Sequence, residues 1–229
     1  MTSSALLVVC GVLSVPAGWF AGILYDRVPD ELPLFRPLVR PRLSGVYLAM
    51  HVTMLAVFLL AARRFADSHR LELADYLLLF TALVALSFID LDTLRLPDRI
   101  VAPLLVVSIP LIAVTSLLQD DAARIRFAVT GGAFYFAFLL VVHLIIPRGM
   151  GFGDVKLAAV MGMYVGWLAP SVVGAIRLTL YAMMIGFLVG SLAGLVVFAF
   201  RRRSRAIPFG PFLAFGTVVV IIFSEQLIK

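Results

Sequence analysis

The stretch YLLLFTALVALSFI, residues 76–89, decides the fold because it carries no charged residue and shows no alternation of polar and apolar positions. A transmembrane helix needs roughly 20 apolar residues to cross the hydrocarbon core, whereas a membrane strand alternates apolar and polar positions. A continuous apolar run therefore favours a helix over a strand of a closed barrel. With its flanking residues, the stretch predicts a membrane-spanning helix over residues 74–90.

The composition of the whole chain supports the same interpretation. Of the 229 residues, 62% are hydrophobic and 14% are charged, and the mean hydropathy is +1.08. A soluble domain of this size needs far more polar surface. We therefore predict an all-α, polytopic membrane protein with about eight transmembrane helices in a single domain, residues 1–229. The one cysteine, Cys10, excludes an internal disulfide and a cysteine-built zinc site.

Apolar runs separated by charged residues, prolines or glycines give eight predicted spans. They cover residues 5–24, 45–62, 74–90, 99–118, 127–146, 155–173, 178–200 and 211–228. Pro170 interrupts the sixth span, and only Arg177 separates it from the seventh, so one merged span is an alternative. The first span has no basic stretch before it, so we interpret it as a retained span rather than a cleaved signal.

The basic residues predict the orientation, because lysines and arginines gather in cytoplasmic loops. Twelve of the 19 follow odd-numbered spans: Arg27, Arg36, Arg40, Arg42, Arg95, Arg99, Arg148, Lys156, Arg201, Arg202, Arg203 and Arg205. We therefore expect the N-terminus outside and these connections in the cytoplasm. The proline-rich basic loop over residues 25–44 is expected to lie against the anionic inner leaflet.

Two aspartates lie at the ends of predicted spans. Asp90 directly follows the run 76–89, and Asp154 opens the sixth span. Two spans separate them, so both lie at the same membrane face. Two carboxylates brought together near hydrocarbon are costly as two anions, so one of them keeps its proton. Such a pair suits amide hydrolysis, because the ionised member activates water while the protonated member polarises the carbonyl.

Glycines precede Asp154 in the sequence Gly149-Met150-Gly151-Phe152-Gly153. Gly151 and Gly153 allow a positive φ or a close backbone approach, and a bare backbone can hydrogen-bond an extended peptide. Gly151, Phe152, Gly153 and Lys156 are therefore candidate substrate-binding residues. Alternatively, the glycines only make a turn, with Asp154 as the N-cap of a helix.

The segments Ile89-Asp90-Leu91-Asp92, Leu96-Pro97-Asp98 and Gly151-Phe152-Gly153-Asp154-Val155-Lys156-Leu157 together resemble the prepilin peptidases, or type IV leader peptidases, a GxGD class of membrane aspartyl proteases. The segments around Gly18-Trp19-Phe20 and Pro208-Phe209-Gly210-Pro211 resemble the ends of that family's first and last spans. The likeness thus extends over nearly the whole chain.

The resemblance implies an enzyme that cuts a short basic leader from prepilin-like or pseudopilin precursors at the cytoplasmic face of the inner membrane. It implies that Asp90 and Asp154 are the catalytic pair. Asp92, Pro97, Asp98, Pro208, Gly210 and Pro211 belong to the motifs, and we interpret them as structural, with Asp98 capping the fourth span. Many members also carry a zinc-binding CxxC insert after the first span and methylate the new N-terminus with S-adenosylmethionine. Here that loop has about 20 residues and no cysteine, so we expect no zinc and cleavage without methylation.

Other interpretations compete for the same residues. Lys156 is equally consistent with a snorkelling lysine, and His51 and His143 are expected to be packing residues with a hydrogen bond. The same aspartates would serve a proton- or cation-coupled transporter, but transporter sites usually lie near mid-membrane. A non-catalytic pilus or secretion assembly component is the other alternative. The expected partners are precursor proteins and membrane lipid; there is no nucleic-acid module, and the sequence leaves the oligomeric state open.

Overall fold

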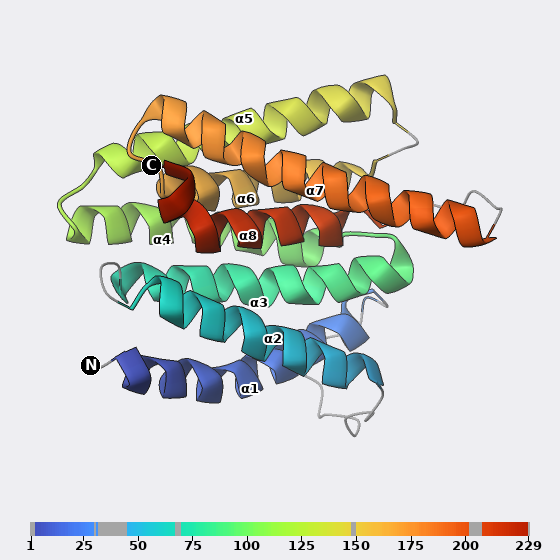
Figure 1. Ribbon diagram of the computed structural model, residues 1–229, viewed down its shortest axis with the longest axis horizontal. Helices are drawn as coiled ribbons and strands as arrows, with labels where there is room; N and C mark the ends of the chain where they lie inside the picture. Colours follow the sequence, from blue (N-terminus) through green and yellow to red (C-terminus); the bar gives the residue numbers. More distant parts are fainter. Residues whose placement is uncertain are drawn as a thin grey trace. The chain divides into compact units, whose positions relative to one another are not determined.

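The computed structural model describes residues 3–29, 31, 45–66, 70–147, 150–201 and 208–228. These ranges contain eight α-helices and no strand, which confirms the predicted fold class (Figure 1). The helices are α1 (Ser3–Arg27), α2 (Gly45–Arg64), α3 (Arg70–Thr93), α4 (Asp98–Leu118), α5 (Ala123–Ile145), α6 (Phe152–Trp167), α7 (Val172–Arg201) and α8 (Gly210–Ile228).

Seven of the helices in the described part are long and apolar enough to cross a membrane. The exception is α6, which has 16 residues and is therefore about 24 Å long. The protein is an integral membrane protein. Most of the loop over residues 25–44 lies outside the described residues, as do Gly149 and the arginines Arg202, Arg203 and Arg205.

The boundary between the sixth and seventh predicted spans needs correction. The sixth helix ends at Trp167 rather than at residue 173, and the seventh begins at Val172 rather than at residue 178. Pro170 lies in the break, where a missing N–H does no harm. Arg177 does not separate the helices. It lies inside α7, and its guanidinium donates a hydrogen bond to the carbonyl oxygen of Ile228 at 3.2 Å.

The chain divides into two compact units, Met1–Thr93 and Leu94–Lys229. In the first unit, α1, α2 and α3 pack against one another. Gly18 and Gly22 of α1 leave room for the side chains of α2. A Cβ at Gly18 would lie 2.9 Å from the His51 ring, and one at Gly22 would lie 2.9 Å from the Tyr47 ring. His51 also donates a hydrogen bond from Nδ1 to the Tyr47 carbonyl oxygen at 2.8 Å, as expected of a packing histidine.

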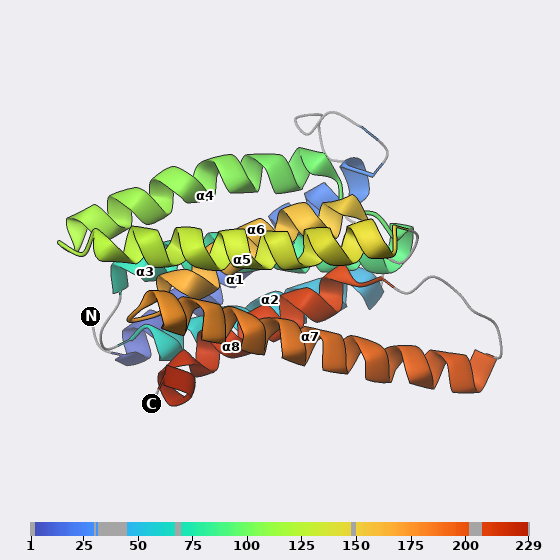
Figure 2. The same ribbon diagram turned by 90° about the horizontal axis from the view of Figure 1, so that it is seen from above.

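In the second unit, α6 contacts α4, α5, α7 and α8 (Figures 1 and 2). Eleven of its 16 residues are buried, so α6 forms the centre of this unit. Glycines bring α5 and α6 into backbone contact, because a Cβ at Gly162 would lie 2.3 Å from the Gly131 carbonyl oxygen. Short helices with little lipid contact are stable only where neighbouring helices enclose them, and α6 meets that condition.

Candidate active site

Asp154 lies in the first turn of α6 and is 7% exposed. Gly151 is the N-cap, with φ −69° and ψ 146°, and its carbonyl oxygen accepts a hydrogen bond from the Asp154 amide at 3.1 Å. The alternative that made Asp154 the N-cap is therefore wrong, since Asp154 is the third helical residue. At this position, its carboxyl group lies at the positive end of the helix dipole, which favours negative charge.

Gly153 makes a close backbone approach to the segment before α4, and its predicted approach to an extended substrate stays a prediction. A Cβ at this position would lie 2.8 Å from Leu96 Cβ and 2.9 Å from the Leu96 carbonyl oxygen. The other predicted use of glycine, a positive φ, is not found at any described glycine. The glycine preceding Asp154 is therefore required by contact with the segment that leads into α4.

Lys156 pairs with Asp98, so the first turns of α4 and α6 are joined by an ion pair. The ammonium nitrogen lies 2.8 Å from Oδ1 and 2.7 Å from Oδ2 of the carboxylate. The predicted capping role of Asp98 is wrong: Pro97 occupies the N-cap, and Asp98 is the first helical residue. A signal for the pair was present in the sequence, because both residues begin spans at the same predicted face.

Phe152 lies between two side chains that hold it in place, although its own side chain is 44% exposed. The Lys156 ammonium lies 5.1 Å from its ring centroid, within range of a cation–π interaction. The His143 ring centroid is 5.6 Å away on α5. His143 donates a hydrogen bond from Nδ1 to the Met150 carbonyl oxygen at 2.8 Å, which confirms its expected packing role. These contacts fix the segment immediately before Asp154.

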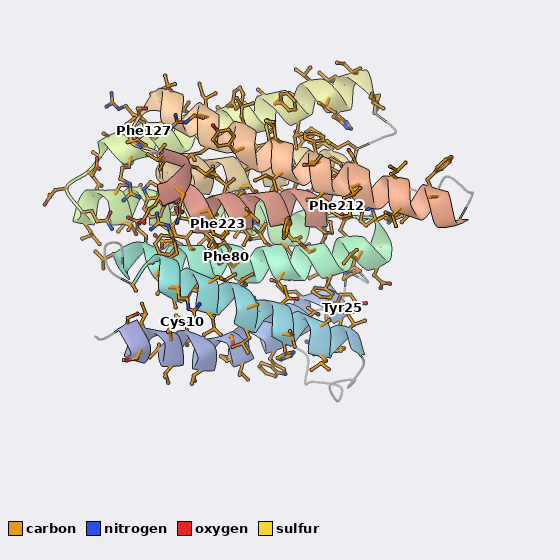
Figure 3. All side chains as sticks on the ribbon, in the orientation of Figure 1. Cys10, Tyr25, Phe80, Phe127, Phe212 and Phe223 are labelled. Atoms are coloured by element: carbon orange, nitrogen blue, oxygen red, sulfur yellow. The ribbon has the colours of Figure 1, made fainter. Side chains whose placement is uncertain are left out.

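The other candidate aspartates lie at the end of α3, in the first unit. Asp90 is 5% exposed. Asp92 is exposed and accepts a hydrogen bond from the Tyr25 hydroxyl at 3.0 Å; Figure 3 shows Tyr25 near the end of α1. The ends of α1 and α3 therefore lie together, which agrees with the shared membrane face that the count of spans predicted. That the carboxyl groups of Asp90 and Asp154 meet stays a prediction.

The last motif begins α8 in the second unit. Gly210 is the first helical residue and is buried, and Pro211 occupies the first turn, where a proline is tolerated. Pro208 lies in the connection before the helix. Figures 1 and 2 show the start of α8 at the same end of this unit as the start of α6. That these residues have a structural role stays a prediction.

In the described part of the chain, no three His, Cys, Asp or Glu side chains gather closely enough to hold a metal ion. The polar side chains with contacts to the residues around Asp154 include Lys156, Asp98 and His143.

Comparison with known proteins gives one consistent result. The model of the type IV leader peptidase family matches residues 77–199, which is more than half of the chain and includes Asp90 and Asp154. A prepilin leader peptidase/N-methyltransferase of Aeromonas hydrophila is 33% identical over 157 residues, which cover 67% of this chain and 50% of that protein. Proteins of the same name are 26% identical over 190 residues in Bacillus subtilis and 30% identical over 190 residues in Dichelobacter nodosus.

The coverage of these relatives is uneven. The chain spans about half the length of the Aeromonas proteins that it matches. The match covers 82% of this chain and 70% of the Bacillus relative, and 81% of this chain and 60% of the Dichelobacter relative. No solved structure matches the chain with significance.

Proposed function

Because the chain belongs to the type IV leader peptidase family, we propose that it is a membrane aspartyl endopeptidase that removes the short basic leader from prepilin-like or pseudopilin precursors. One observation carries the proposal. Two aspartates, Asp90 and Asp154, lie buried at the ends of two helices, and both fall inside the segment that matches the family. Burial of a carboxyl group is costly unless a partner or a function compensates for it.

The proposed reaction needs no group beyond the two carboxyls and water. One ionised carboxylate takes a proton from the water, whose oxygen attacks the carbonyl carbon of the scissile peptide bond. The other carboxyl is protonated and donates a hydrogen bond to the carbonyl oxygen as negative charge develops there. The carboxyl that took the proton from water then gives it to the amide nitrogen, the C–N bond breaks, and the carboxyls return to sharing one proton between them.

Substrate binding in this proposal involves the segment around Gly151, Phe152 and Gly153. The extended backbone of Gly151 and the exposed ring of Phe152 lie immediately before Asp154. An extended precursor can hydrogen-bond such a backbone, as peptides do at exposed strand edges. The precursor's apolar helix would stay in the lipid while its leader reaches the aspartates.

The active site is proposed to face the cytoplasm from the inner membrane, because the basic residues favour that orientation. We also propose cleavage without methylation and without zinc, because the loop over residues 25–44 is short and contains no cysteine. Purified protein incubated with a pilin precursor should give a product that begins at the new N-terminus and lacks the added mass of a methyl group. Mass spectrometry of the product measures both.

Asp90→Asn and Asp154→Asn test the catalytic assignment. Each variant should lose cleavage by about a thousandfold or more, because each removes the carboxyl that activates water or the one that polarises the carbonyl. Asp121→Asn is the matched control, since Asp121 is an exposed carboxylate between α4 and α5. It should cleave at the wild-type rate.

The readout is the rate of precursor cleavage per molecule of protein in the membrane. Normal cleavage by Asp90→Asn or by Asp154→Asn contradicts the proposal. So does an Asp121→Asn variant that is as inactive as the other two.

A further inference from the structure

The ion pair between Asp98 and Lys156 connects the first turns of two helices. Both carboxylate oxygens lie within 2.8 Å of the ammonium nitrogen, and the side chains are 62% and 35% exposed. Ion pairs this exposed contribute little to the stability of a fold. The pair's position is more informative than its strength, because Lys156 lies two residues after Asp154.

Three further contacts act on the same turn of α6. Gly153 lies against Leu96, so the backbone before α4 contacts the backbone at the start of α6. The Lys156 ammonium also lies over the Phe152 ring, and the His143 ring contacts Phe152 from α5. Asp154 thus belongs to a turn that is held by one ion pair from α4, by one backbone contact from the segment before α4, and by one ring contact from α5.

We propose that Asp98 and Lys156 are positioning residues that fix the direction of the Asp154 carboxyl. The inference rests on the proposed function, because it assigns the pair a role in the same cleavage reaction. Residues at i and i+2 of a helix do not face each other, so Lys156 acts on Asp154 through the placement of the turn. Catalysis depends on such placement, because an error of about 1 Å can lower a rate by about a hundredfold.

The alternative role for Lys156, contact with the substrate, fits the structure less well. Its ammonium already binds two carboxylate oxygens and an aromatic ring. The leader in the proposed reaction is basic, and a positive charge repels it. A positioning role lowers kcat and leaves KM nearly unchanged, whereas a substrate contact raises KM.

A double-mutant cycle tests the pair. Asp98→Asn and Lys156→Met should each lower kcat by about tenfold, with KM within about twofold of the wild-type value. The double variant Asp98→Asn/Lys156→Met should be no slower than the slower single variant. Either single substitution already breaks the ion pair, so the second substitution has no further interaction to remove. Lys156→Arg keeps the charge, and its guanidinium can still pair with both carboxylate oxygens of Asp98, so it should retain more of the wild-type kcat than Lys156→Met does.

Arg177→Met is the matched control. Like Lys156→Met, it removes one exposed cation with a hydrogen-bonded partner, but Arg177 contacts Ile228 at the C-terminal end of α8. It should cleave at the wild-type rate. Rates are measured per molecule of folded protein, with folding monitored by the thermal transition in detergent, so that a loss of protein is not read as a loss of kcat.

The outcomes separate the two proposals. If wild-type protein does not cleave, or Asp154→Asn cleaves normally, the proposed function is overturned. If cleavage depends on Asp154 but both single variants at positions 98 and 156 keep the wild-type kcat, the positioning role is overturned. Losses that multiply in the double variant, or that appear in KM alone, overturn it as well.

Discussion

Among single residues, Gly153 is the most constrained in the candidate site. Its constraint comes from the neighbouring segment, because a Cβ would come within 3 Å of both Leu96 Cβ and the Leu96 carbonyl oxygen. Real side chains do not tolerate such separations, so one backbone must move when a side chain is added. Since Asp154 is the next residue, the movement changes the direction of its carboxyl.

Gly153→Ala should therefore lower the cleavage rate by about a hundredfold, the effect expected for a displacement of about 1 Å. Gly45→Ala is the control, because a Cβ at Gly45 meets nothing within 4 Å. The rate of precursor cleavage measures both. Equal activity of Gly153→Ala and wild type would show that the contact with Leu96 does not constrain the site.

Sequence reasoning found the aspartates and glycines of the site but not all of their contacts. The buried Asp90 and Asp154 stand out in sequence because each is a carboxylate beside a long apolar run. The pairing of Lys156 with Asp98 was missed, because which side of each helix a residue occupies depends on tertiary packing. Gly151 has backbone angles that any residue can adopt. Of these two glycines, only Gly153 needs to be a glycine, because of its close approach to Leu96.

At the scale of helices, α6 depends on its neighbours more than on its length. Its last carbonyls face the end of the helix, and Arg124 of α5 donates a hydrogen bond from Nε to the Trp167 carbonyl oxygen at 3.0 Å. The Arg124 guanidinium also lies 4.7 Å from the Trp167 ring centroid and donates to Gln119 Oε1 at 2.7 Å. A buried arginine thus satisfies the end of a helix that is too short to reach across the hydrocarbon on its own.

The glycines between α5 and α6 predict a measurable loss of stability on substitution. Gly162→Ala should lower the free energy of unfolding by about 1–3 kcal/mol, because its Cβ would overlap the Gly131 carbonyl oxygen and push the helices apart. Gly11→Ala is the control, since the nearest atom to a Cβ there is 3.9 Å away. The thermal transition in detergent is the measurement. A transition unchanged by Gly162→Ala contradicts tight packing of this pair.

Helices were easier to predict than their ends. Long apolar runs identify the helices, but the sequence predicts the break between α6 and α7 at Arg177, whereas the structure has it at residues 168–171 around Pro170. An arginine in an apolar run looks like a boundary in sequence. In the structure, a carbonyl oxygen of α8 accepts a hydrogen bond from Arg177. The residues next to Arg177 in the sequence do not indicate this distant partner.

For the whole molecule, the contacts within each unit agree with the alternation of helix ends across the membrane. The hydrogen bond from Tyr25 to Asp92 joins the ends of α1 and α3, and the ion pair between Asp98 and Lys156 joins the starts of α4 and α6. Counting spans predicted that the members of each pair lie at the same membrane face, but not that they are in contact. The proposed approach of Asp90 to Asp154 involves one residue from each unit, so only the family resemblance supports that part of the proposal.

Labelling of single cysteines tests the proposed orientation. In a Cys10→Ala background, Asp121→Cys lies between α4 and α5 and should react with a membrane-impermeant maleimide on intact cells. Ser204→Cys lies between α7 and α8 and should react only after the membrane is permeabilised. The reverse pattern would place the start of α6, and Asp154 with it, outside the cytoplasm.

The length of α7 has a consequence for the surrounding lipid. Its apolar part, Val172–Ala199, has 28 residues and is about 42 Å long, against a hydrocarbon depth of about 30 Å. Such hydrophobic mismatch is relieved by tilting the helix or by thickening the bilayer around it. α8 packs closely on α7, because a Cβ at Gly216 would overlap the Ala182 carbonyl oxygen, so we expect a tilt of α7 to carry α8 with it. We therefore expect the thickness of the bilayer to change the tilt angle of α8, whose first turn contains Gly210 and Pro211 of the motif.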